Sequence, residues 1–201
     1  MSAPPHIPED PRTAKLTRRA LLALGAVAGA TAITRYWGSS FPHLFGPDPA
    51  PPLSFAEAQD YRDFLAIHPL RYLAPGEIIR PHLKERSGVP CGIPPKEYWT
   101  NILPTLEAAD ELRGRLGVPL LRINSAYRSP AYNAECPGAV PGSQHTFNRA
   151  LDLVYDCPSE EAFSAALALR AEGFFTGGLG LYDGFIHLDT RGRDATWGIE
   201  V

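Results

Sequence analysis

The apolar residues between residues 94 and 117 recur at helical spacing and predict the longest helix of the chain. They stand mostly three or four positions apart: Ile102, Leu103, Leu106, Ala109, Leu112 and Leu116. Pro104 should break or kink this helix, because proline has no N–H to donate, and Gly117 can end it. The segment is most simply explained as core packing.

Three shorter segments also carry helix signals. The capping box Ser54-Phe55-Ala56-Glu57 predicts a helix that runs to about Ile67, before a proline. A second helix should begin at Pro75 and include Leu83, and a third should run from residues 158 to 173.

Strand patterns lie in the second half of the chain. We expect strands over residues 120–124 and 149–155, and two short strands over residues 177–189 around a turn at Asp183-Gly184. The tail that follows should pack at the domain edge through Trp197. Residues 129–144 read as an irregular loop, and a loop this long between packed elements is often functional.

Length and composition fit one globular domain with extensions. The chain has 201 residues, of which 44% are hydrophobic and 20% charged, with a net charge of −3. No basic block with interleaved aromatic residues occurs, so we expect no nucleic-acid partner. Nine of the 21 prolines precede residue 53, which indicates an unpacked N-terminal region.

The N-terminal region predicts export. Arg18 and Arg19 directly precede an uncharged run rich in alanine and glycine, which is short for a membrane span. We therefore expect a twin-arginine signal peptide at residues 1–34, a proline-rich linker at 35–53 and a folded domain at 54–201, exported to the bacterial periplasm. The alternative is a retained anchoring helix. After removal of the signal, no stable membrane span is expected.

Export to an oxidising compartment changes the reading of the three cysteines. Cys91, Cys136 and Cys157 could then include one disulfide, and the odd count leaves at least one thiol unpaired. The pair Cys136–Cys157 is favoured, because these two residues flank the segment that carries the candidate chemistry.

Candidate metal chemistry centres on residues 143–152, a loop that turns into a strand. His145 and Asp152 lie seven residues apart, and His187 follows in a later strand. Catalytic zinc sites use three such ligands and leave a fourth position to water. In extended chains, residues two apart share a face, so Asp152 and His187 can converge if their strands are neighbours, with His145 reaching in from the loop.

Three motifs raise this hypothesis above chance. They are Tyr127-Arg128-Ser129, then Ser143-x-His145 with Asp152, then Gly178-Leu179-Gly180 followed by Phe185-Ile186-His187-Leu188-Asp189. Together they resemble the zinc D-alanyl-D-alanine carboxypeptidase and murein endopeptidase family, which includes VanX-like dipeptidases. The resemblance covers roughly residues 75–197. It implies an α+β, hedgehog-like fold, in which helices surround a small antiparallel sheet that carries one Zn²⁺.

The resemblance also implies roles for individual residues. His145, Asp152 and His187 match the zinc ligands. Arg128 matches the arginine that binds the substrate carboxylate or the developing oxyanion, which suits a guanidinium with paired donors. Tyr127 and Ser143 are expected to contact the substrate, a peptide of peptidoglycan.

Two positions depart from the family pattern. Asn148 stands where the family has glycine, and it is the next best residue if the backbone needs positive φ. Gly184 stands where many members place the acidic general base. Asp183 and Asp189 are the nearby carboxylates that could move the proton, with Asp189 preferred, although it could instead orient a ligand histidine.

The sequence thus favours one function and leaves alternatives. The favoured function is a periplasmic zinc peptidase, expected to be a monomer, that acts as a D-Ala-D-Ala carboxypeptidase or as a murein endopeptidase. The missing base at position 184 favours a second reading, a zinc-containing module that binds cell-wall peptides without cleaving them. A third reading has no metal at all.

Overall fold

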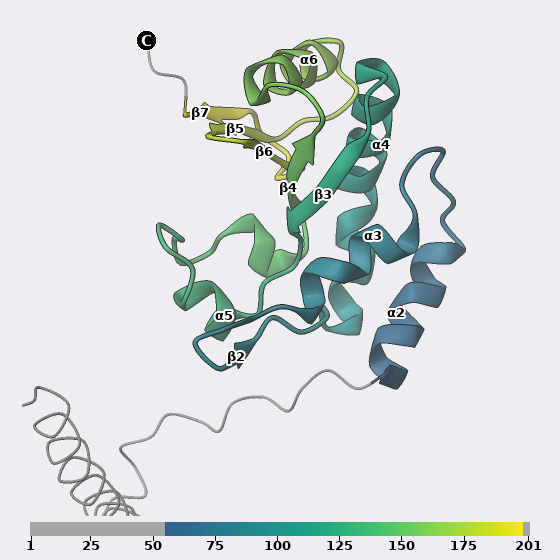
Figure 1. Ribbon diagram of the computed structural model, residues 1–201, viewed down its shortest axis with the longest axis vertical. Coiled ribbons are helices and arrows are strands. Elements are labelled where there is room, and N and C mark those ends of the chain that lie inside the picture. The colour runs from purple at the N-terminus through teal and green to yellow at the C-terminus, as the bar shows by residue number, and fades with distance from the viewer. Residues whose placement is uncertain (1–54, 199–201) are drawn as a thin grey trace, which may run out of the picture. The chain divides into compact units, whose positions relative to one another are not determined.

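The computed structural model describes residues 55–198 (Figure 1). The predicted signal peptide, the linker and Ser54 of the predicted capping box lie outside this range. Among the described residues, no helix is long and apolar enough to cross a membrane. The domain is α+β: a five-stranded sheet with helices packed against it.

The sheet has the strand order β3-β4-β6-β5-β7. Its strands are β3 (Leu120–Ser125), β4 (Ala150–Tyr155), β5 (Gly178–Tyr182), β6 (Phe185–Asp189) and β7 (Ala195–Trp197). Neighbours are antiparallel except β5 and β7, which pair in parallel. The predicted antiparallel sheet is therefore confirmed for four strands, and the predicted tail is its fifth strand.

The helices form the rest of the domain. They are α2 (Phe55–Ala66), α3 (Pro75–Ile79), η1 (Arg80–Leu83), η2 (Lys96–Ile102), α4 (Leu103–Leu116), α5 (Pro130–Ala134), η3 (Gln144–Phe147) and α6 (Ser159–Ala171). A two-stranded ribbon joins β1 (Glu85–Arg86) to β2 (Val89–Pro90). Helices α4 and α6 contact each other and the sheet (Figure 1).

The helix signals of the sequence are confirmed with two differences. Pro104 does not break α4 but lies in its first turn, where 3-10 helix η2 becomes α-helix and proline costs no hydrogen bond. Gly117 ends α4 in the left-handed conformation, as predicted. The loop of residues 129–144 was expected to be irregular, yet it contains α5, because Ser129 caps the Tyr132 N–H.

Alternation along β4 gives the sheet two unlike faces. Leu151 and Leu153 are fully buried on the helix side, in a core that includes Leu106 and Leu169. Burying each such side chain stabilises the fold by about 1.5–3 kcal/mol. The alternate residues of β4, Asp152 among them, face the other side. The apolar face thus fixes the register that presents Asp152.

The cysteines do not follow the prediction. Cys91, Cys136 and Cys157 are all free thiols, so the expected pair Cys136–Cys157 does not form. The Cys91 thiol is buried and donates to the Tyr127 carbonyl. Burial raises the pKa of this thiol to about 12, which keeps it protonated and unreactive.

Candidate metal centre

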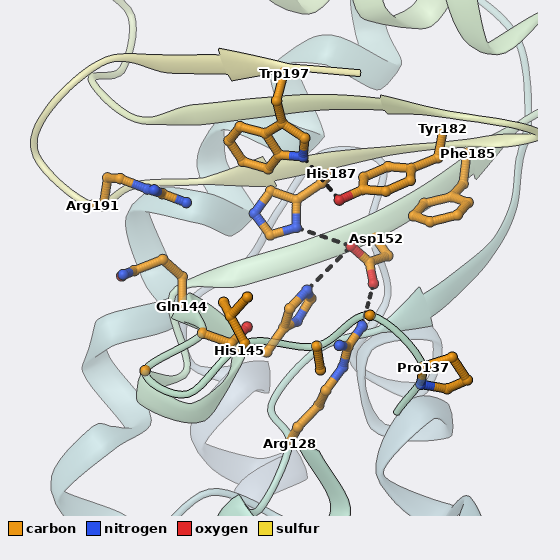
Figure 2. A pocket seen from close by; sticks show the side chains of 15 residues that line it. Arg128, Pro137, Gln144, His145, Asp152, Tyr182, Phe185, His187, Arg191 and Trp197 are labelled. Carbon is orange, nitrogen blue, oxygen red and sulfur yellow. Dashed lines mark hydrogen bonds and ion pairs between the residues drawn. The ribbon is translucent and has the colours of Figure 1, made fainter. Parts of the chain in front are cut away.

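Three candidate ligands converge on the face of the sheet opposite α4 and α6 (Figure 2). Strands β4 and β6 are neighbours, and their register places Asp152 directly opposite His187. His145 comes from η3, the turn just before β4. One ligand atom from each of the three residues lies within 4.8 Å of the others, and all three residues are buried. The predicted convergence is therefore confirmed.

Asn148 ends η3 and aims the chain into β4. Its φ of 55° and ψ of 46° are left-handed, as the replaced family glycine suggested. The Asn148 N–H bonds back to the carbonyls of Gln144 and His145, and its side-chain amide donates to the Tyr98 carbonyl at 2.9 Å. Asparagine thus supplies the required backbone conformation and adds a contact that glycine would lack.

The hydrogen bonds of His145 leave one ring nitrogen available. Its Nδ1 lies 2.6 Å from the Ala126 carbonyl, which can only accept, so Nδ1 carries the proton. In a neutral ring, Nε2 is then a bare lone pair. This lone pair faces Asp152 Oδ1 at 3.1 Å.

His187 repeats this arrangement with its nitrogens exchanged. Its Nε2 lies 2.8 Å from Asp189 Oδ2, and its Nδ1 lies 3.0 Å from the same Asp152 Oδ1. If Nε2 donates to Asp189, the neutral ring again turns a lone pair toward Asp152. Two lone pairs and a carboxylate oxygen then meet at one point, which is favourable only if positive charge lies among them.

The pKa shifts agree with a site that attracts positive charge. Burial lowers the pKa of His145 and so favours its neutral form. At His187, burial also opposes charge, but hydrogen bonds to Asp152 and Asp189 outweigh it and raise the pKa. Burial would raise the pKa of Asp152, yet the two imidazoles hold it well below its usual range. Either a proton on His187 or a metal ion can supply the charge, and zinc accepts this set of nitrogen and oxygen donors.

Arg128 holds the outer oxygen of Asp152. Its Nη2 donates to Asp152 Oδ2 at 2.6 Å, and its Nε donates to Ser125 Oγ at 2.7 Å. Its backbone N–H bonds the His145 carbonyl, which ties the arginine to η3. Within residues 55–198, Nη1 has no hydrogen-bond partner, and the side chain lines the cavity. Arg128 can therefore orient Asp152 and still offer donors to a bound molecule.

Asp189 lies behind His187 rather than in the cavity. It is fully buried and accepts from His187 Nε2, from the Gly178 N–H at 3.0 Å and from Arg191 Nε at 2.8 Å. Burial opposes its ionisation, but the bonds from His187 and Arg191 hold its pKa below the usual range. These contacts fit an ionised residue that orients His187, the second of the two roles predicted for it.

The other candidate base lies at the surface. Asp183 is exposed in the turn between β5 and β6 and does not line the cavity. Gly184, at the position of the family base, has a φ of +75°, which a residue with a side chain rarely adopts. An acidic residue at position 184 would therefore place strain on the backbone of the turn.

The ligands open into a cavity of about 510 Å³ (Figure 2). Arg128 and Ser143 line it as expected, but Tyr127 does not: it is buried beside a separate hollow, and burial raises its pKa to about 12. Sequence reasoning missed several polar and aromatic lining residues, among them Gln144, Tyr182, Arg191 and Trp197. Strand parity could have found Tyr182, which lies two positions after the residue opposite His187. Trp197 gave no such signal, because its placement depends on the parallel pairing of β7.

The comparisons agree with this geometry. The family model described as Peptidase M15 matches residues 71–189, more than half of the chain, and the match includes all three candidate ligands and Arg128. The chain therefore belongs to the M15 peptidases, a family of zinc metallopeptidases, as the motifs predicted. No curated protein and no solved structure matches the chain significantly.

Proposed function

We propose that the protein is a zinc-dependent peptidase that hydrolyses peptide bonds in peptidoglycan stem peptides or cross-links. The observation that carries this proposal is the meeting of the His145 and His187 lone pairs with one oxygen of Asp152. These three residues would hold the zinc and leave a position for water. Zinc held by these residues would supply a Lewis acid that lowers the pKa of bound water toward neutrality.

The chain's own residues then position the substrate. Arg128 keeps Asp152 fixed through Nη2 and presents Nη1 to the cavity, where it can bind a peptide carboxylate or the developing oxyanion. Asp189 and the Ala126 carbonyl hold the two imidazoles so that they need no rearrangement when the metal binds. Ser143 lines the same cavity and is proposed to contact the peptide.

A second candidate function is a zinc-containing module that binds cell-wall peptides without cleaving them. Its supporting observation is that, among the described residues, Asp152 is the one carboxylate that lines the cavity. Asp189 is fully engaged, and Asp183 would have to move with its turn to reach a substrate. A peptidase must still carry a proton from water to the leaving amine.

The proposal includes the context predicted from the sequence. Residues 1–34 would direct twin-arginine export, residues 35–53 would serve as a linker, and residues 54–201 would form a hedgehog-like peptidase domain in the periplasm. Peptidoglycan is the polymer that such a domain would meet there. The monomeric state is part of the same proposal.

Mass spectrometry of purified muropeptides after incubation with zinc-loaded protein tests the function and the bond together. Loss of one terminal alanine identifies a carboxypeptidase, and conversion of cross-linked dimers to monomers identifies an endopeptidase. His145→Ala is the control and should give neither product. If the wild type gives no product but the immobilised protein retains muropeptides on a column, the function as a binding module is supported instead.

A further inference from the structure

Tyr182 lines the cavity with a hydroxyl group to which no role has yet been assigned. It is the last residue of β5 and pairs with Phe185 across the hairpin. Gly180, two residues earlier, pairs with His187. Residues two apart on a strand share a face, so the Tyr182 ring projects on the side that carries the candidate ligands. Figure 2 shows its hydroxyl directed toward His187 and Trp197 at the rim of the cavity.

Two contacts hold the Tyr182 ring in this position. The ring stacks on Phe185, with centroids 4.6 Å apart and planes within 2°. The Trp197 indole N–H donates to the Tyr182 hydroxyl at 2.8 Å. An indole nitrogen can only donate, so Tyr182 accepts in this bond and keeps its own O–H proton for another acceptor. Among residues 55–198, no such acceptor bonds it.

Trp197 in turn is placed by a glycine. A Cβ at position 180 would lie 2.4 Å from the Trp197 indole nitrogen, so only glycine lets the ring cross β5. The ring packs on His187, with centroids 5.1 Å apart, and lies below the Arg191 guanidinium at 5.3 Å. The same tryptophan therefore touches a candidate zinc ligand and fixes the hydroxyl of Tyr182.

We propose that Tyr182 is a catalytic residue and that Trp197 is its positioning residue, an inference that rests on the peptidase function proposed above. The Tyr182 O–H donates a hydrogen bond to the carbonyl oxygen of the scissile peptide bond, which gains negative charge as water adds to the carbon. The phenol keeps its proton. The carbon–oxygen bond forms, the carbon–nitrogen bond breaks, and the proton lost by water ends on the leaving amine.

This role differs from that of Arg128. Arg128 is bound to Asp152 and Ser125 and carries charge throughout, so it attracts anionic groups of the substrate before and during the reaction. The Tyr182 hydroxyl is neutral, and its bond strengthens only as the carbonyl oxygen becomes charged. Interactions of this kind raise kcat with little effect on KM.

The test compares the kinetics of muropeptide hydrolysis by zinc-loaded wild type, Tyr182→Phe and Tyr72→Phe. Tyr72 is an exposed tyrosine that does not line the cavity, so Tyr72→Phe is the matched loss of a hydroxyl. Removing one donor to a developing oxyanion costs about 10²–10³ in kcat. We expect that loss in Tyr182→Phe, with KM, zinc content and melting temperature unchanged, and full activity in Tyr72→Phe.

Trp197→Phe distinguishes positioning from a merely structural role. It should lower kcat in the wild type but have little further effect in the Tyr182→Phe background, because the two side chains act through one hydroxyl. If the wild type cleaves muropeptides and Tyr182→Phe has the same kcat, the Tyr182 proposal is overturned and the peptidase function stands. A zinc-loaded wild type that cleaves no muropeptide would overturn both. If Tyr182→Phe fails to fold, equal kcat in Trp197→Phe and wild type is the contradicting result.

Discussion

Two buried histidine environments in this domain differ in what surrounds the imidazole. His82, in η1, is almost fully buried against the edge of the Tyr61 ring, and its Nδ1 donates to the Gly92 carbonyl. Its Nε2 has no partner within the described residues. His145 and His187 also have one nitrogen tied to an acceptor, but their other nitrogens meet at Asp152. Burial of a histidine therefore does not identify it as a metal ligand. The convergence of the His145 and His187 lone pairs on Asp152 does.

The comparison predicts that zinc raises the melting temperature of a His82 variant but not that of an Asp152 variant. Asp152→Asn removes the shared anionic ligand, so zinc should no longer raise the melting temperature, and hydrolysis should be lost. In the wild type, zinc at a hundredfold excess over its Kd adds about 2.7 kcal/mol, which corresponds to roughly 5–10 °C in a domain of this size. His82→Leu should keep the full increase. Differential scanning fluorimetry with and without zinc measures both variants.

Acid should destabilise the fold through His82. Burial lowers the pKa of His82 to about 4, whereas the unfolded chain has its ordinary value of 6.5. Between these values the unfolded state binds the proton and the folded state does not, so stability falls as pH decreases from 6.5 toward 4. The loss amounts to about 3 kcal/mol. Urea unfolding of metal-free protein at pH 7 and pH 4 should show it, and a His82→Leu variant with an equally large pH dependence would contradict it.

Asp189→Asn separates the two roles considered for Asp189. If Asp189 orients His187, the variant should bind zinc about 10–100-fold more weakly, as is typical when a partner of a ligand histidine is lost. If Asp189 instead accepts the proton of water, kcat should fall while zinc affinity is preserved. Competition with a chelator measures the affinity, and muropeptide hydrolysis at saturating zinc measures kcat.

The part of the site that could be predicted depends on local periodicity. Asp152 alternates with buried leucines in β4, and His187 alternates with buried Ile186 and Leu188 in β6. Parity predicted that the two residues converge if their strands are neighbours, and the pairing of β4 with β6 meets that condition. Asn148 was expected to tolerate positive φ if the position required it, and its φ is positive. Patterns of this kind are set within one strand or one turn and are visible in the sequence.

The remaining features depend on pairings between distant segments. The parallel partner of β7 decides that Trp197 covers Gly180, and no local pattern specifies it. Asp189 was preferred as the base from its parity, but its contacts to Gly178 and Arg191 depend on how β5 and the tail pack. The favoured Cys136–Cys157 disulfide does not form, although both cysteines flank the metal loop in the sequence.

Elemental analysis of purified protein tests the central claim most directly. We predict one zinc per wild-type chain and one per chain in His82→Ala, whose imidazole meets no other ligand. His145→Ala should contain almost none, because it loses one of the three converging donors. Stoichiometric zinc retained in His145→Ala would contradict the assignment of the site.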